Sequence, residues 1–199
     1  MHEARVVFEF TSFWHMGTGS ARGFALDAVV ARDARGLPII PGRTVKGLLR
    51  EAVTLLGECE ASEVPDTTLE QLFGRTNGPS ESRYDGSSGS LVFSSATLDP
   101  DPTLDPEWNA ALASHLFGAV ASTSLDEHGV AAQHTLRRIE VTVPLRLSAV
   151  VSTRDEPDDA WVQLLQRAAP LLRSVGSHRH RGLGRVTVTV LANYDGGVS

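Results

Sequence analysis

The chain has 199 residues, 41% of them hydrophobic, and a formal net charge of −6. This length suits one domain with a sizeable core, and no apolar run is long enough to span a membrane. The single cysteine, Cys59, excludes an internal disulfide and a cysteine zinc cluster. Because the N-terminus also lacks the layout of a signal peptide, the sequence predicts a cytoplasmic protein.

The first two elements are predicted near the N-terminus. Residues 4–12 alternate apolar and polar side chains well enough for a strand. Residues 44–56 place their apolar side chains on one face and are expected to form a helix. Thr44 could cap the start of this helix, and Gly57 could end it.

The middle of the chain predicts strands. Residues 89–98 are expected to form a strand and residues 105–117 a short helix. Residues 136–152 predict a long strand, with a break expected at Pro144 because proline cannot donate to a sheet.

The last two elements are a helix and a strand. Residues 158–173 predict the helix, with Asp158 as its cap. Pro170 is expected to disturb the last turn because it lacks an N–H group. Residues 185–192 alternate clearly and predict a strand.

The order strand, helix, strand, strand, helix, strand is the βαββαβ pattern. The predicted fold class is therefore α+β, with a ferredoxin-like, RRM-like core and long insertions. The insertions are the glycine-rich, acidic or polar segments at about 13–43, 58–88 and 118–135, within a single domain over residues 1–199. Domains of this kind often present a sheet face or their loops to RNA, but the fold alone does not show function.

The charge is unevenly distributed along the chain. Residues 1–50 carry +3, residues 51–170 carry −12 and residues 171–199 carry +3. The acidic total argues against general affinity for nucleic acid, yet it permits a local basic groove. Of the eighteen basic residues only Lys46 is lysine. Arginine suits bidentate phosphate contacts, although a bias in base composition would explain the same count.

The segment GSHRHRGLGRV, residues 176–186, holds three glycines, three arginines and two histidines, and no acid. Glycines let backbone N–H groups approach a ligand, and arginines offer forked donors to phosphates. A strand follows, which excludes the nucleotide loops that open a helix. We expect a phosphate-contacting loop; the alternative is a turn whose arginines are solvated. The candidate residues are Gly176, His178, Arg179, His180, Arg181, Gly182 and Gly184.

A second basic segment is LPIIPGRTVKGLLRE, residues 37–51. Arg43, Lys46 and Arg50 cluster at the start of the predicted helix, where the free N–H groups already attract anions. Cations there oppose the helix dipole, and a bound phosphate backbone would offset this cost. The alternative is that Arg50 is structural and pairs with Glu51 or with an acid across the fold.

Five segments of the chain, in their order, resemble motifs of the RAMP superfamily, the repeat-associated proteins of CRISPR effector complexes. They are the two basic segments above, FWHMGTG at 13–19, LFGRTN and GSLVFSSATL. Within this superfamily, the chain is most similar to backbone subunits of type III complexes. The resemblance implies an RNA-binding subunit that holds guide RNA, stacks with other RAMP-type subunits in a filament and meets target RNA. Residues 118–135 stand where the family has a thumb-like hairpin.

The candidate catalytic residue is an aspartate. Asp27 interrupts an apolar run in GFALDAVVARD, whereas Asp33 in RDARGLP has the pattern of a turn. The resemblance implies that Asp27 corresponds to the loop aspartate that cleaves target RNA in such subunits. Its carboxylate would take or orient the proton of the attacking ribose 2′-OH, or hold a divalent metal such as Mg²⁺. This makes the chain a candidate metal-dependent endoribonuclease acting within an assembled complex.

Three side chains after the first strand allow either role. His15 could contact RNA or be a packed histidine. Phe13 and Trp14 could stack on a base or pack in the core. Other functions also remain open: a non-catalytic assembly subunit, an endoribonuclease that processes repeat RNA, or a small-molecule enzyme on the same fold.

Overall fold

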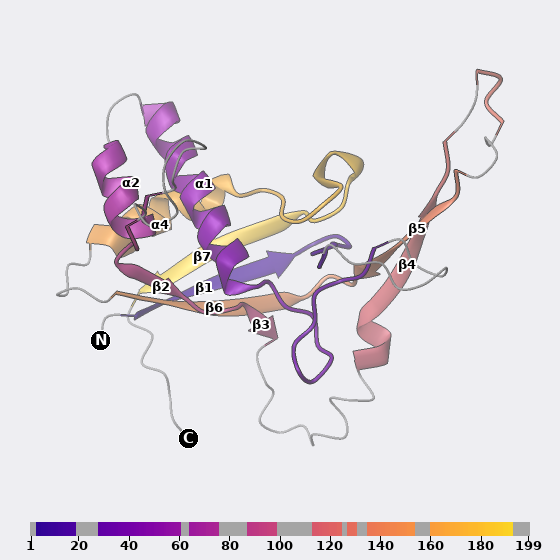
Figure 1. The fold of residues 1–199 in the computed structure, drawn as a ribbon, viewed down its shortest axis with the longest axis horizontal. Coiled ribbons are helices and arrows are strands. Elements are labelled where there is room, and N and C mark those ends of the chain that lie inside the picture. The colour runs from indigo at the N-terminus through magenta and orange to yellow at the C-terminus, as the bar shows by residue number, and fades with distance from the viewer. Residues whose placement is uncertain are drawn as a thin grey trace.

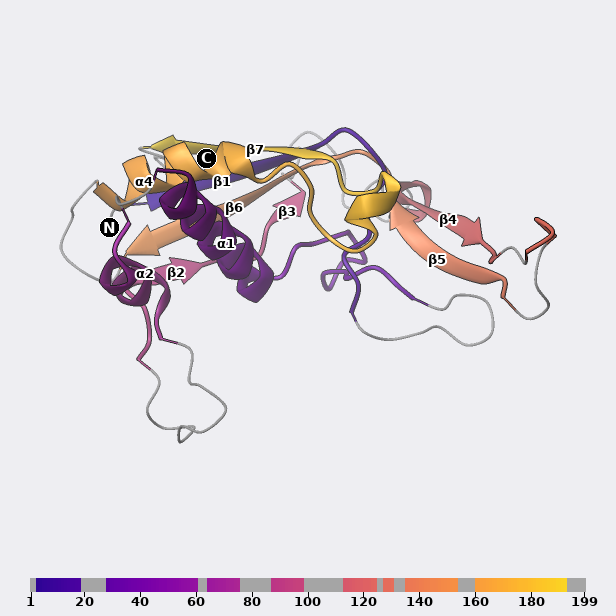
Figure 2. The same ribbon diagram turned by 90° about the horizontal axis from the view of Figure 1, so that it is seen from above.

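The computed structural model describes residues 3–18, 28–60, 64–75, 87–98, 113–124, 127–130, 135–153 and 160–192. These residues form a mixed α+β architecture with antiparallel sheets. Helices lie on one face of a sheet, and a two-stranded hairpin projects from the end of the molecule opposite to helices α2 and α4 (Figures 1 and 2).

Strand β1 (Glu3–Phe10) lies inside the main sheet. It pairs antiparallel with β6 (Arg146–Thr153) on one side and with β7 (Val186–Ala192) on the other. At one register position Val6 faces Ala149 and Val190, and all three side chains are buried. The strands predicted at both ends of the chain are confirmed.

The strand predicted at 89–98 is two short strands, β2 (Leu91–Phe93) and β3 (Thr97–Leu98). Both pair antiparallel with β6. The break between β2 and β3 has a local cause. Ala96, which lies between them, forms two backbone hydrogen bonds with Ile40, of 2.8 and 3.0 Å, instead of pairing with β6. This contact ties the segment before the first helix to the sheet.

Helix α1 (Gly42–Glu60) confirms the predicted helix but is longer at both ends. Thr44 is not its cap: the helix begins at Gly42, whose N–H donates to Ser95 Oγ at 3.1 Å. Gly57 lies inside the helix and does not end it. The apolar face of α1 packs in the core, where Leu49 and Val53 are fully buried.

Helix α4 (Ala160–Ala168) and the 3₁₀ turn Ala169–Leu171 form the second predicted helix. Pro170 lies in that turn, as expected for a residue that disturbs the last turn. Asp158, the predicted cap, lies outside the described residues. Together α1 and α4 cover one face of the sheet (Figure 1), and Leu165 is buried between the layers.

Helix α2 (Asp66–Phe73) was not predicted, because it lies in the acidic, glycine-rich stretch assigned to an insertion. Leu69 and Phe73 are one turn apart and are its buried residues. With the partly buried Leu72 they are the only apolar residues of this eight-residue helix, a pattern too short to distinguish from loop in sequence.

The strand predicted at 136–152 is divided between two sheets. Residues Arg137–Thr142 form β5, which pairs antiparallel with β4 (Phe117–Ser122), and the rest belongs to β6. The break expected at Pro144 is confirmed. Strand β4 was missed inside the polar segment 118–135. Of the helix predicted at 105–117, the described part includes only the 3₁₀ turn Ser114–Leu116.

The main sheet has the strand order β2-β6-β1-β7. This mixed architecture is consistent with the predicted ferredoxin-like fold, in which helices cover one face of an antiparallel sheet. None of the described helices is long and apolar enough to cross a membrane.

Candidate nucleic-acid interface

The glycine-rich loop lies against the segment that follows β1. Ser177 N–H donates to the His15 carbonyl at 3.0 Å, and Gly184 N–H donates to the Phe13 carbonyl at 2.7 Å. At the base of the loop, Val175 N–H donates to the Gly184 carbonyl at 2.8 Å. Two of the motifs found in sequence, FWHMGTG and GSHRHRGLGRV, are therefore neighbours, and the backbone of the loop is fixed.

Three glycines of the loop have a positive φ, and at two of them a side chain would also collide with backbone. Gly176 has φ +93° and Gly184 has φ +75°, a region that favours glycine. A Cβ atom on Gly176 would collide with the His15 carbonyl oxygen, and one on Gly184 with the Val175 carbonyl oxygen. The glycines thus serve close backbone packing. Gly182, with φ +84°, faces open space.

The arginine and histidine side chains of the loop lie at the surface of this fixed backbone. Arg179, His180 and Arg181 form the 3₁₀ turn η3 (Arg179–Arg181) and all three are exposed. His178 precedes the turn in the left-handed region, at φ +61°, and its Nδ1 lies 3.1 Å from Ser177 Oγ. The loop therefore offers two exposed arginines and two exposed histidines on one short segment.

The loop also contacts helix α1. Arg179 Nη1 lies 3.5 Å from Glu51 Oε1, so the loop does have an acidic neighbour, although none within its own sequence. Glu51 is the last residue of the second basic segment, and this ion pair brings the two segments together. Arg181 has no carboxylate partner among the residues that the structure describes.

The basic residues of α1 differ in their surroundings. Arg43 is exposed and Lys46 is partly exposed, and neither forms an ion pair within the described part of the chain. Arg50 Nη1 donates to the Gly74 carbonyl at 3.1 Å, at the end of α2. This contact gives Arg50 a structural partner, although it is a backbone carbonyl and not Glu51 or another acid as the alternative supposed. Arg43 and Lys46 remain available to a ligand.

The aromatic segment after β1 is mostly packed. Trp14 is fully buried, stacks on Phe10 with ring centroids 4.4 Å apart, and donates from Nε1 to the Val143 carbonyl at 3.0 Å. His15 is 3% exposed, and its Nδ1 lies 2.6 Å from the Glu140 carbonyl oxygen. The packed alternative fits both residues, and direct RNA contact by the His15 side chain does not. Phe13, 46% exposed, is the aromatic ring left for stacking.

A buried carboxylate that the sequence did not reveal lies at the base of the hairpin. Glu140 Oε1 accepts from Arg32 Nη2 at 2.8 Å, and Oε2 accepts from Val30 N–H at 3.0 Å. The Arg32 guanidinium also lies over the Phe117 ring, 3.8 Å from its centroid. The Glu140 N–H donates to the Ala28 carbonyl at 3.0 Å. Residues 28–32 are thereby held against β5.

The two aspartates compared in sequence fall differently. Asp33 is confirmed as a turn residue, because its Oδ1 accepts from the N–H groups of Arg35 and Leu37, both at 2.9 Å. Asp27 lies outside the described residues, directly before Ala28. Within the described residues, no group of three or more His, Cys, Asp or Glu side chains is arranged to hold a metal ion.

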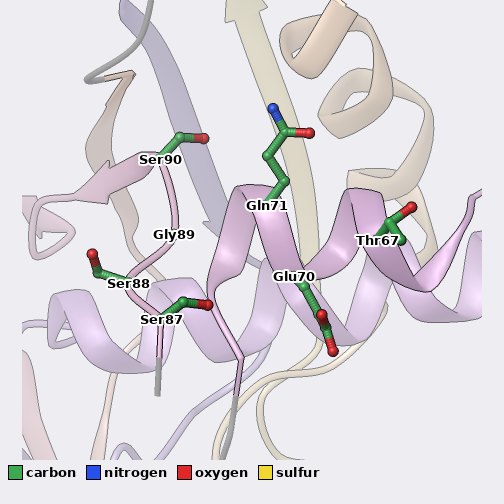
Figure 3. A pocket seen from close by; sticks show the side chains of 7 residues that line it. All are labelled: Thr67, Glu70, Gln71, Ser87, Ser88, Gly89 and Ser90. Atoms are coloured by element: carbon green, nitrogen blue, oxygen red, sulfur yellow. The ribbon is translucent and has the colours of Figure 1, made fainter. Parts of the chain in front are cut away.

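A separate polar pocket of about 500 Å³ lies between α2 and the segment before β2 (Figure 3). Its lining residues are Thr67, Glu70, Gln71, Ser87, Ser88, Gly89 and Ser90. No arginine or lysine is among these residues and Glu70 is acidic, so the lining offers phosphate no charge-assisted contact. The loop and the start of α1 remain the better candidate interface.

Comparison with known proteins places the chain in a family. A model of the RAMP superfamily matches residues 7–187, so the chain belongs to that superfamily. No curated protein matches it in sequence.

Two solved structures share the fold. A chain of "Cryo-EM structure of the Type III-B Cmr-beta bound to cognate target RNA" matches with a TM-score of 0.60 and 15% identity, over 96% of this chain and 61% of that chain. A chain of "Type III-B Cmr-beta Cryo-EM structure of the Apo state" matches with a TM-score of 0.62 and 12% identity, over 97% and 98%. The present chain thus spans less than two thirds of the length of the chain that it matches in the first structure. At these identities the likeness shows the fold alone.

Proposed function

We propose that the chain is a guide-RNA-binding backbone subunit of a type III CRISPR ribonucleoprotein, and that it cleaves the paired target RNA. The observation that carries RNA binding is the Arg179–Glu51 contact, because it places the glycine-rich loop beside α1. Arg43 and Lys46 of α1 and Arg181 of the loop are then cations of two neighbouring segments. Membership of the RAMP superfamily and the fold shared with Cmr-β chains support the same function.

The RNA backbone is the expected ligand. The loop offers forked guanidinium donors, which suit phosphate oxygens and carry no base sequence information. Affinity should therefore fall steeply with salt, with a log–log slope of about −0.7 per neutralised phosphate on a single strand. We expect little dependence on base sequence.

Cleavage is proposed to depend on Asp27, whose carboxylate would take or orient the proton of the attacking 2′-OH. Mg²⁺ is commonly held by one or two carboxylates together with substrate phosphates, so a divalent ion at this residue needs no larger protein cluster. Among the described residues no such cluster occurs. Stacked RAMP-type subunits are the expected protein partners.

The test of RNA binding is the double substitution Arg179→Ala with Arg181→Ala. Each lost charge-assisted contact should weaken binding by up to about 1.5–3 kcal/mol, measured with the purified chain and a labelled single-stranded RNA. Arg146→Ala is the matched control, because Arg146 is an exposed arginine at the start of β6. Unchanged affinity in the double variant, or strong preference for one short sequence, would contradict the proposal.

Sequencing of the RNA that co-purifies with the protein distinguishes the alternatives. Guide-length RNA carrying repeat sequence is expected for a backbone subunit. Cleavage of free repeat RNA by the isolated chain would instead favour the processing endoribonuclease. Guide RNA without target cleavage in the assembled complex would favour the assembly subunit.

A further inference from the structure

Glu51 is a single carboxylate among the cations of the candidate interface. Its Oε1 lies 3.5 Å from Arg179 Nη1, and the two side chains are 48% and 41% exposed. The first turn of α1 has no acidic residue, and neither has the glycine-rich loop. Any phosphate that approaches Arg179 therefore meets Glu51 at the same guanidinium.

The contact is not needed to hold the loop. The hydrogen bonds from Ser177 and Gly184 to the carbonyls of His15 and Phe13 already fix its backbone. At 3.5 Å, the pair is longer than a charge-assisted hydrogen bond, and exposed pairs of this kind contribute little to stability. Glu51 can therefore be exchanged for another partner at small cost.

The helix face beside Glu51 is open. Gly47 lies one turn earlier on the same face of α1, since residues four apart are neighbours on a helix. Gly47 is exposed, and a Cβ atom there would meet nothing within 4 Å. The helix surface one turn before Glu51 is therefore not covered by another part of the described chain.

We propose that Glu51 competes with RNA phosphate for Arg179 and thereby limits RNA affinity. This inference rests on the proposed RNA-binding function. Carboxylate and phosphate both accept the forked donors of arginine, so each can replace the other. While RNA is absent, Glu51 neutralises Arg179. When RNA binds, phosphate displaces Glu51, and the freed carboxylate keeps the affinity below what the cations alone would give.

The experiment is a Glu51→Gln substitution, with binding of a fluorescently labelled oligouridylate measured by anisotropy at low and at physiological salt. Removing the competing charge should tighten binding by about two- to five-fold, the size expected for an exposed pair. Glu58→Gln is the matched control, because Glu58 is exposed on the same helix. It should leave the affinity unchanged.

The variant Arg179→Ala decides whether Glu51 acts through that arginine. In this background, Glu51→Gln should have no effect on affinity. A gain that persists there would mean that Glu51 only repels RNA through space, which overturns the inference. Unchanged or weaker binding in the single Glu51→Gln variant also overturns it, since the carboxylate would then be inert or would position Arg179. If the wild-type chain shows no salt-dependent binding, the proposed function itself fails, and this inference fails with it.

Discussion

Two arginine–carboxylate pairs in this molecule have the same chemistry and different environments. Arg32–Glu140 is close, at 2.8 Å, and its side chains are 26% and 8% exposed. Arg179–Glu51 is longer, at 3.5 Å, with side chains 41% and 48% exposed. The first pair is part of a buried network at the hairpin base. The second lies at the surface, where a ligand can replace either partner.

The difference suggests a division between positioning and binding. Glu140 holds the segment that begins at Ala28, through the Ala28 carbonyl and Val30 N–H. Asp27 directly precedes this segment in the chain. The loop and α1, in contrast, keep exposed cations. We therefore expect changes near the buried pair to affect stability or cleavage, and changes near the exposed pair to affect RNA affinity.

The largest expected effect is on cleavage. In an assembled complex with guide RNA and complementary target, Asp27→Ala should keep target binding and slow cutting by about 10²–10⁴-fold, as for a lost general base. A single deoxy substitution at the cut site should stop cleavage because it removes the attacking 2′-OH. Denaturing gels of labelled target measure the rate.

Asp33→Ala is the control, since Asp33 accepts turn hydrogen bonds and should affect mainly stability. If Asp33→Ala abolishes cleavage and Asp27→Ala does not, Asp33 is the catalytic aspartate and the proposal for Asp27 is wrong. Chelation with EDTA tests the divalent ion separately. A wild-type complex that binds target and never cuts would support the assembly subunit.

The next effect is on stability at the buried pair. Arg32→Ala leaves the Glu140 carboxylate buried, with Val30 N–H as the one donor to its oxygens among the residues that the structure describes. Breaking a buried pair costs about 3–5 kcal/mol, and we expect the lower end because Arg32 is partly exposed. Urea unfolding measures this loss.

Arg35 forms a more exposed ion pair with Asp33 nearby. Arg35→Ala should therefore lower the free energy of unfolding by less than about 1 kcal/mol. Equal effects of Arg32→Ala and Arg35→Ala would remove the distinction between buried and exposed pairs.

The frame of the fold could be predicted from sequence, because β1, α1, α4 and β7 have strong periodic patterns. Long-range partners could not. Glu140 stands beside Val141 in one strand and both are buried, so alternation gives no sign of its role. Its partner Arg32 is distant in the chain. Likewise, nothing in the two basic segments indicated that Glu51 would meet Arg179.

The glycine-rich loop could be predicted from its composition, but the separate roles of its glycines could not. Composition does not distinguish glycines that pack against backbone from a glycine that faces open space. In the structure, Gly176 and Gly184 touch carbonyl oxygens whereas Gly182 does not. The role of His15 could not be predicted for a similar reason. Its hydrogen-bond partner, the Glu140 carbonyl, belongs to the hairpin, which is distant in sequence.

A smaller effect tests how firmly the loop backbone is fixed. Gly184→Val adds a clash with the Val175 carbonyl to the strain of positive φ, so it should lower both stability and RNA affinity even with all arginines present. Gly182→Val has the strain of φ +84° without a clash and should cost about 1–3 kcal/mol at most. Thermal unfolding of the two variants should rank Gly184→Val as the more damaging. The reverse ranking would mean that the loop packs differently from this structure.

The smallest effect concerns the exposed pair itself. Arg179→Ala should change the free energy of unfolding by no more than about 1 kcal/mol, because both side chains are solvated and the loop backbone is held by other hydrogen bonds. The same variant should still weaken RNA binding, so stability and affinity separate at this residue. At Arg32 we expect the opposite separation: Arg32→Ala should lower stability, because its partner Glu140 is buried, without a direct effect on RNA affinity. If Arg179→Ala destabilises the protein as much as Arg32→Ala does, the Glu51 contact is structural, and Arg179 is not free to exchange its carboxylate for phosphate.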